Sequence, residues 1–176
     1  AVARPSDLRR TRPWHWRDEP IFGEFLSVVG ATPVVLGVNE VYPSLQTGVV
    51  NAVPGSALAA VSLQWHTRVR FVTQQNSGII VGATIVNKTT FDGLTEGQRA
   101  ALTSTAERAH TALRRAIRRD DDRALQTVIR RGTTVTDLTA TQGEWATAQA
   151  TTRQRLTGRL YSAALLRSVE SAAAAR

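Results

Sequence analysis

The sequence predicts an α/β fold, because short runs of apolar residues alternate along the chain with amphipathic helices. The stretch 40–65 has the pattern of a helix, a brief apolar strand and a second helix. A long helix expected over 95–131 is followed by β-branched residues at 133–138 that favour a strand. With 176 residues and 42% hydrophobic content, the chain can form one domain or two small lobes around a packed core.

The first half of the stretch 40–65 carries clear signals for where its elements end. Val41 and Leu45 lie one helical turn apart and give the first helix one apolar face. Gly48 ends this helix, since glycine takes the left-handed conformation without steric cost. Val49–Val53 then predicts a short buried strand at the junction of two lobes, which Pro54 and Gly55 end.

Polar side chains gather around the ends of this strand and of the two helices. Ser56 is well suited to cap the second helix, which carries Trp65 on its apolar face. Open α/β sheets bind ligands where strands end and helices begin. We therefore expect the ligand to lie near the polar residues of this region, Gln46, Asn51 and Ser56.

The remaining elements continue the alternation. A helix is expected at 20–29, and strands are expected at 34–36, 71–73 and 78–86. Thr95 and Gln98 form a capping box that opens the helix 95–131. Arginines and aspartates near position 120 are expected to pair along this helix, because consecutive aspartates point about 100° apart and cannot converge on one metal ion.

An aromatic segment near the N-terminus is a second candidate for ligand contact. Trp14 and Trp16 are two residues apart in a predicted strand, so their indoles lie on one face. Aromatic walls with a few hydrogen-bonding groups describe a ligand pocket. Packing in the core is the alternative interpretation for Trp14, Trp16 and Trp65.

Several segments resemble one known family. E-V-Y-P-S-L-Q-T-G-V-V-N-A at 40–52 is similar to the pattern E-x-Y-x-A-L-Q-x-G-V-V-D-G/A of the DctP-type solute receptors of TRAP transporters, the bacterial extracellular solute-binding proteins of family 7. Asn51 stands where the family usually has Asp. Shorter similarities are P-S-D-L at 5–8, V-V-G-A-T-P-V-V-L at 28–36, F-V-T at 71–73 and N-K-T-T-F-D-G-L at 87–94. The resemblance runs from Asp7 to about Leu160 and covers the later part of a family member.

The resemblance implies a periplasmic-binding-protein-like (type II) lobe with a mixed sheet flanked by helices. Residues 1–138 would form the α/β ligand-binding lobe, including hinge segments and the long helix. Residues 139–176 would form a C-terminal helical segment that packs back on the lobes. The first part of a family member, which supplies most of the other lobe, has no counterpart in the chain.

The function implied by the resemblance is solute capture. The chain would be the periplasmic or extracytoplasmic solute-binding component of a TRAP-type transporter, holding a small organic ligand, an organic acid or an apolar compound, in an interlobe cleft. Its partners would be the membrane subunits of that transporter. The alternative is an uncoupled carrier or sensor module for an apolar or lipid-like ligand.

The residues expected to bind the ligand are Trp14, Trp16, Arg17, Gln46, Asn51, Ser56, Trp65 and Asn76. The family carries an Arg that pairs with a ligand carboxylate, and the alignment puts Trp14 at that position. An indole has no positive charge, so a carboxylate buried against it would be costly. The sequence therefore predicts a neutral, largely apolar ligand, unless Arg17 or Arg12 replaces the missing charge.

Other classes of function find little support in the sequence. We expect no enzyme activity, no cofactor and no metal site, since no nucleophile–base pair, Walker loop or glycine-rich dinucleotide motif is present and cysteine is absent. The net charge is +8, but the basic residues are spread along helices without interleaved aromatics, so no nucleic-acid partner is expected. No apolar run reaches the length of a membrane span, so no transmembrane helix is expected. The N-terminus has neither an initiator Met nor the apolar region of a signal peptide, which suggests a mature, processed or excised chain.

Overall fold

Three parallel segments lie side by side at the centre of the body. In the structure, a computed structural model that describes residues 1–74 and 82–174, β1 (Trp14–His15) pairs with β2 (Val34–Val35). On the other side of β1, Pro13 forms a parallel bridge with Ala52, and the amide of Trp14 donates to the carbonyl of Ala52 at 2.8 Å. The segment around Trp14 is therefore the middle one of the three.

The predicted strand Val49–Val53 is wrong in extent, since only Ala52 makes a bridge. The amide of Val50 donates to the carbonyl of Ser44 in the preceding helix, which keeps Val50 in the turn after that helix. Pro54 has no N–H to donate, so the pairing cannot continue beyond Val53.

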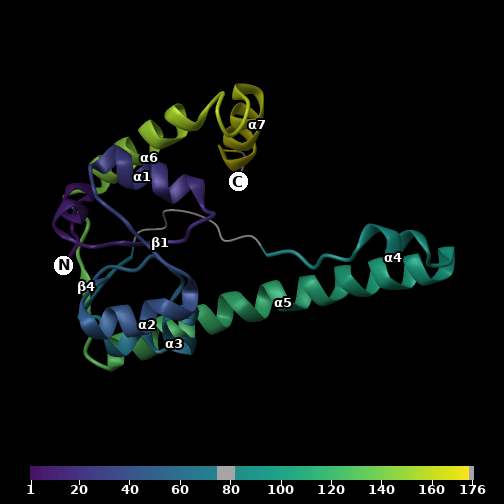
Figure 1. Ribbon diagram of the computed structural model, residues 1–176, viewed down its shortest axis with the longest axis horizontal. Coiled ribbons are helices and arrows are strands. Elements are labelled where there is room, and N and C mark those ends of the chain that lie inside the picture. The colour runs from purple at the N-terminus through teal and green to yellow at the C-terminus, as the bar shows by residue number, and fades with distance from the viewer. Residues whose placement is uncertain (75–81, 175–176) are drawn as a thin grey trace.

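Helices connect the three segments, as expected for an α/β fold (Figure 1). α1 (Pro20–Val29) links β1 to β2, and α2 (Val38–Thr47) links β2 to Ala52. Gly30 and Gly48 end these helices with positive φ values of 72° and 75°, which explains the two glycines. The shorter helices of the body are η1 (Pro5–Arg10), α3 (Ala57–Ser62) and η2 (Trp65–Thr67).

A second parallel pair joins β3 (Phe71–Thr73) to β4 (Thr134–Thr136), with Phe71 opposite Thr134. All strand pairs within residues 1–74 and 82–174 are parallel, so the antiparallel part of the expected mixed sheet is not found there. The expected strand 78–86 is also not seen as such: 78–81 lie outside the described residues, and 82–86 form no assigned strand.

Two hydrophobic clusters hold the body together. The first joins α1 to α6 (Gln142–Leu156), where the rings of Phe25 and Trp145 stack with centroids 6.2 Å apart. Arg155 and Arg159 of the α6 region reach Glu24 of α1. That residues 139–176 pack back on the lobes stays a prediction. The second cluster lies under α2 and contains Trp14, Val41, Leu45, Val50 and Trp65.

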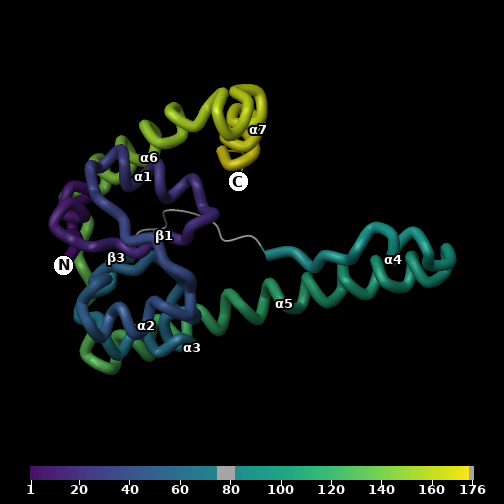
Figure 2. The backbone as a smooth tube through the Cα atoms, viewed as in Figure 1, coloured from purple at the N-terminus to yellow at the C-terminus, as the bar shows by residue number. Residues whose placement is uncertain are grey.

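A long arm projects from this body (Figures 1 and 2). It contains α4 (Lys88–Asp92) and the first part of α5 (Glu96–Arg130), which is unbroken over 35 residues and begins with the predicted Thr95 cap. This confirms the helix predicted over 95–131. The last part of α5 lies in the body, where Ala124 and Val128 are buried and α3 packs against it.

The chain ends in α7 (Ala163–Ala174), which follows a break at Gly158. Gly143 lies within the first turn of α6. Among the described residues, no helix combines the length and the apolar character needed to span a membrane.

Candidate functional site

The parallel segments of the body end at one common edge. Trp16 follows β1, Gly37 follows β2 and begins α2, and Gly55 and Ser56 follow Ala52 and begin α3. Because ligands of open α/β sheets bind outside the carboxyl ends of the strands, this edge is the candidate ligand site. We call it the carboxyl edge, defined by Trp16, Arg17, Gly37, Gly55 and Ser56.

The three tryptophans predicted to bind the ligand form one aromatic cluster, but they differ in exposure. Trp14 is only 5% exposed, and its indole N–H donates to the carbonyl of Leu36 at 3.0 Å. Trp65 is also buried and meets Trp14 edge-on, with centroids 5.4 Å apart. Trp16 stacks on Trp14 at 6.5 Å and is 55% exposed. Of the three indoles, Trp16 is the one that this structure presents at the surface.

The helix N-termini at the carboxyl edge are occupied by side chains of the chain itself. Glu19 accepts from the amides of Ile21 and Phe22 at the start of α1, and Glu40 accepts from the amide of Gly37 at the start of α2. Ser56 accepts from the amide of Ala59 at the start of α3. A negatively charged ligand at the start of α1 or α3 would therefore have to displace a cap, whereas at α2 Glu40 takes only the amide of Gly37 and the first-turn amides carry no side-chain cap among the described residues.

Arg17 supplies positive charge at the same edge. It follows Trp16 directly, its side chain is exposed, and no ion pair found in residues 1–74 and 82–174 involves it. Arg12, the other arginine considered for a carboxylate, donates from Nε to the carbonyl of Gly48 at 2.8 Å. Arg12 thus holds the turn after α2, which leaves Arg17 as the better placed of the two.

Two predicted site residues lie at the opposite ends of these elements. Gln46 is in the last turn of α2, roughly 12 Å along the helix from its start. Asn51 precedes Ala52, and its Oδ1 accepts from the amide of Arg12 at 2.6 Å. The structure therefore separates Gln46 and Asn51 from Trp16 and Ser56, while Asn76 lies outside the described residues.

Tyr42 on α2 lies beside Arg68, which donates to its hydroxyl at 3.4 Å. This hydrogen bond, together with contributions from Thr67 and Gln46, lowers the pKa of the Tyr42 phenol from its ordinary value. The pair links α2 to the segment after η2 and makes no contact that defines a site.

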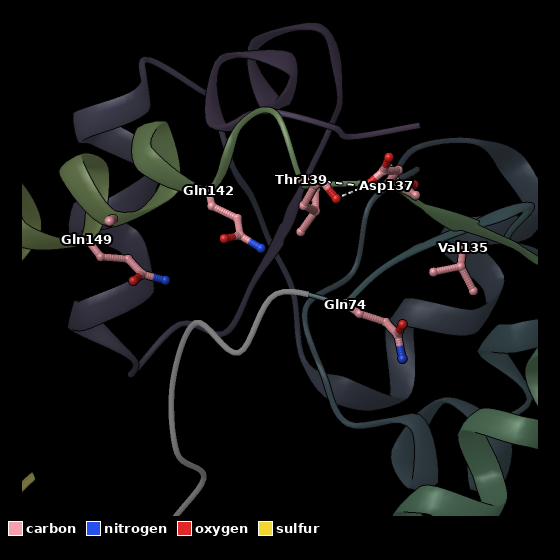
Figure 3. Close-up of a pocket in the computed structure, with 9 residues that line it drawn as sticks. Gln74, Val135, Asp137, Thr139, Gln142 and Gln149 are labelled. Atoms are coloured by element: carbon pink, nitrogen blue, oxygen red, sulfur yellow. Dashed lines mark hydrogen bonds between the residues drawn. The ribbon is translucent and has the colours of Figure 1, made fainter.

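An open hollow of about 780 Å³ lies where β3 and β4 end (Figure 3). Gln142 and Gln149 reach it from α6, and Gln74 and Val135 lie on its other side (Figure 3). Nε2 of Gln149 and the hydroxyl of Thr136 are buried and have no hydrogen-bond partner among the residues that the structure describes. The wall is thus formed mainly by neutral amide and hydroxyl groups.

The only charge in the wall of the hollow, within the described part of the chain, is that of Asp137. The Thr139 hydroxyl and amide donate to this carboxylate at 2.7 and 2.9 Å, and they hold the pKa of Asp137 below its ordinary value. No periodic signal in the sequence pointed to these residues, because isolated glutamines and a turn aspartate are common on any surface.

The aspartates near position 120 make different interactions. Asp120 lies within 3.4 Å of Arg119 and 3.7 Å of Arg123, as expected for pairs along a helix. Asp121 instead accepts from the amide of Leu58 at 2.8 Å and so fixes the start of α3 to α5. Residues 1–74 and 82–174 contain no cluster of His, Asp and Glu arranged to hold a metal ion.

Comparison with known proteins gives one consistent result. A sequence model of the bacterial extracellular solute-binding proteins of family 7, DctP, matches residues 5–156. A curated relative, the C4-dicarboxylate-binding periplasmic protein DctP of Rhodobacter capsulatus, is 29% identical over 109 residues. That match covers 62% of this chain and 33% of the relative.

Solved structures share the fold. An extracytoplasmic solute receptor of Bordetella pertussis that binds pyroglutamic acid superposes with a TM-score of 0.78 at 22% identity. A TRAP periplasmic solute-binding protein of a Sulfitobacter species with bound β-D-galacturonate gives 0.76 at 16% identity. Each comparison covers 90% of this chain and 52% of the solved chain, so the chain spans about half their length. At these identities the likeness confirms the α/β periplasmic-binding-protein-like fold.

Proposed function

Because the chain belongs to the bacterial extracellular solute-binding proteins of family 7, we propose that it is part of the extracytoplasmic solute-binding component of a TRAP-type transporter. In this role it captures a small organic acid between two lobes, of which it contributes one, and delivers it to the membrane subunits of the transporter. Relatives whose names state a ligand bind C4-dicarboxylates, pyroglutamate or sugar acids, which supports an acid as the ligand class here. This role requires no enzymatic step and places the protein in the periplasm.

The structural observation that carries the proposal is the exposure of two adjacent residues, Trp16 and Arg17, at the carboxyl edge. Trp16 offers an exposed indole face, backed by the buried Trp14, for the apolar or ring portion of a ligand. Arg17 offers a guanidinium, which binds a carboxylate through two parallel hydrogen bonds. Since side chains take the amides at the starts of α1 and α3, we assign to Arg17 the charge that Trp14 lacks.

An uncoupled carrier or sensor for an apolar ligand is the second candidate. It is favoured by the replacement of the family's Arg with Trp14 and by the aromatic stack that results. In that case the ligand would lie on Trp16 and leave Arg17 in solvent. The two candidates thus differ in which of two adjacent side chains controls affinity.

Calorimetry on the complete two-lobed protein tests this difference. The probes are glucuronate, galacturonate, pyroglutamate and succinate, together with glucose as the uncharged counterpart of glucuronate. We expect one carboxylate to bind, and Arg17→Gln to weaken it at least about tenfold. Arg115→Gln, on an exposed part of the arm, is the matched control and leaves affinity unchanged.

One result would remove Arg17 from the proposal, and another would decide against an acid as the ligand. Carboxylate binding that survives Arg17→Gln would remove Arg17 from the site. Binding of an apolar probe such as a fatty acid methyl ester, lost in Trp16→Ala only, would establish the second candidate. If the complete protein bound none of the probes, both candidates would be wrong.

A further inference from the structure

The turn that carries Trp16 and Arg17 is closed by Glu19. The amide of Glu19 donates to the carbonyl of Trp16 at 3.1 Å, so residues 16–19 form a β-turn with Arg17 at one of its central positions. The two carboxylate oxygens of Glu19 accept from amides in the first turn of α1, at 3.0 and 2.6 Å. Glu19 therefore joins the carboxyl edge to the start of α1.

The carbonyl of Glu19 is bound by a side chain of β1. Nε2 of His15 lies 2.6 Å from this carbonyl oxygen. A carbonyl can only accept, so Nε2 carries the proton and donates. His15 is half-buried, and its own carbonyl accepts from the amide of Leu36 at 3.3 Å, which fixes its backbone to the segment after β2. The amide, the carbonyl and the carboxylate of Glu19 are thus all engaged, and His15 ties the turn back to the strand.

Gly23 leaves room for the imidazole of His15 against α1. A Cβ added at Gly23 would lie 2.9 Å from Nε2 of His15 and 3.2 Å from its Cε1, which is too close for either atom to stay in place. Glycine is unfavourable inside a helix, yet Gly23 is the fourth residue of α1. The approach of His15 to the helix is a physical reason for this glycine.

We propose that His15 is a positioning residue of the ligand site, which holds the turn 16–19 in the conformation that presents Trp16 and Arg17 to a solute. This inference rests on the proposed function, because the solute is what the two side chains are held for. Without the bond from His15, the carbonyl of Glu19 is released and the turn samples more conformations. Ordering the turn again on binding costs free energy, which a turn already held in place avoids.

Hydrogen exchange of the Glu19 amide in the complete two-lobed protein tests the hold on the turn without a ligand. We expect His15→Ala to speed this exchange about five- to tenfold, because the turn opens more often. His15→Gln keeps an N–H donor at a similar distance from Cα and should exchange as slowly as the parent.

Gly23→Ala tests the same contact from the side of the helix. The added methyl group displaces the imidazole, so exchange at Glu19 should be faster than in the parent. In the His15→Ala background the same substitution should have no further effect, because the ring it displaces is gone. Gly143→Ala is the matched control: it also lies in the first turn of a helix, its methyl group meets no atom of the described residues within 4 Å, and exchange at Glu19 should not change.

Calorimetry with glucuronate, galacturonate, pyroglutamate and succinate tests the consequence for binding. For each acid that binds the parent, His15→Ala and Gly23→Ala should weaken the affinity about three- to tenfold. His15→Gln should restore it to within about twofold of the parent, which a general loss of stability would not explain. Gly143→Ala should leave the affinity unchanged.

Three results would overturn the proposal. The first is exchange at Glu19 that is the same in His15→Ala and in the parent. The second is a His15→Gln variant as impaired as His15→Ala, since the effect would then come from the lost ring and not from the hydrogen bond. The third is faster exchange with unchanged affinity. If the parent binds none of the four acids, the proposed function fails, whereas the exchange experiment still decides whether His15 holds the turn.

Discussion

Three neighbouring groups contact the indole of Trp14. Trp16 covers one face, Trp65 meets it edge-on, and the Leu36 carbonyl accepts its N–H. Because its polar atom is satisfied by backbone, this side chain fixes the position of β1 relative to β2. Trp16, two residues later, owes its orientation at the carboxyl edge to that arrangement.

Replacing these two tryptophans one at a time should have different effects on the free energy of unfolding. Trp14→Ala removes a buried ring and a buried hydrogen bond, so we expect the free energy of unfolding to fall by about 3–5 kcal/mol. Trp16→Ala should cost about 1 kcal/mol or less, since more than half of this residue is exposed. Urea denaturation of both variants measures the difference. Equal losses would show that Trp14 is not the packing residue described here.

The same residue shows what a single sequence can and cannot establish. The two-residue spacing placed Trp14 and Trp16 on one face, and their stacking agrees with that. The spacing could not tell which indole is covered, because this depends on Trp65, about 50 positions away in the chain. The ligand role predicted for these residues stays a prediction, now centred on Trp16 and Arg17.

At the scale of elements, the turn between β4 and α6 depends on Asp137. Its carboxylate accepts from the Thr139 hydroxyl and amide, and these bonds require the ionised form. The folded state therefore has the lower pKa, and the unfolded chain binds more protons near the ordinary Asp value of 3.8. The stabilisation from this turn is present above that value and is lost as the pH falls through the folded pKa.

Thr139→Ala tests this dependence. We expect the variant to unfold at a lower urea concentration than the parent at pH 6, because the hydroxyl donor is gone. The gap should shrink as the pH falls below 3.8 and through the lowered pKa of the folded state, because the carboxyl group then becomes protonated in both states. Thr147→Ala removes a hydroxyl that bonds only the Gly143 carbonyl, so its gap should not change with pH. A gap for Thr139→Ala that is independent of pH would exclude the carboxylate as the cause.

Elements with local signals were predictable, and elements that depend on distant partners were not. The cap at Thr95, the stop at Gly48 and the cap at Ser56 are all confirmed, because each needs only neighbouring residues. Of the predicted strand Val49–Val53 only one bridge is present. Its extent depends on distant acceptors, since the amide of Val50 donates to the carbonyl of Ser44 and the amide of Asn51 donates to the carbonyl of Arg12. The hollow near Gln74 and Gln149 brings together residues 75 positions apart, which no local pattern reveals.

At the scale of the whole molecule, the charge of +8 is the most conspicuous property. Some of the basic side chains are paired locally, since Arg155 and Arg159 share Glu24, and Arg153 lies 3.5 Å from Glu170. The remaining arginines are distributed over the arm and the body. Of the described ones, only Arg68 and Arg70 lie over aromatic rings, those of Tyr42 and Phe71, and these two isolated pairs form no row of aromatics. This pattern favours a solvated surface over a nucleic-acid interface.

Binding to DNA can be measured directly. We expect the chain to elute from a double-stranded DNA column below roughly 150 mM salt, because non-specific phosphate contacts weaken steeply with ionic strength. An unrelated protein of equal net charge is the control and should elute at a similar concentration. Retention well beyond that control would point to an organised phosphate-binding surface.

The continuity of α5 has a mechanical consequence. Within its 35 residues there is no proline, and Gly97 in the first turn is its only glycine, so the helix is a stiff rod of about 50 Å. One end carries the arm, and the other holds the start of α3 through Asp121, next to Ser56. A displacement of the N-terminal end of α5 would therefore be transmitted along the helix to the neighbourhood of Ser56, because no loop interrupts the helix between them.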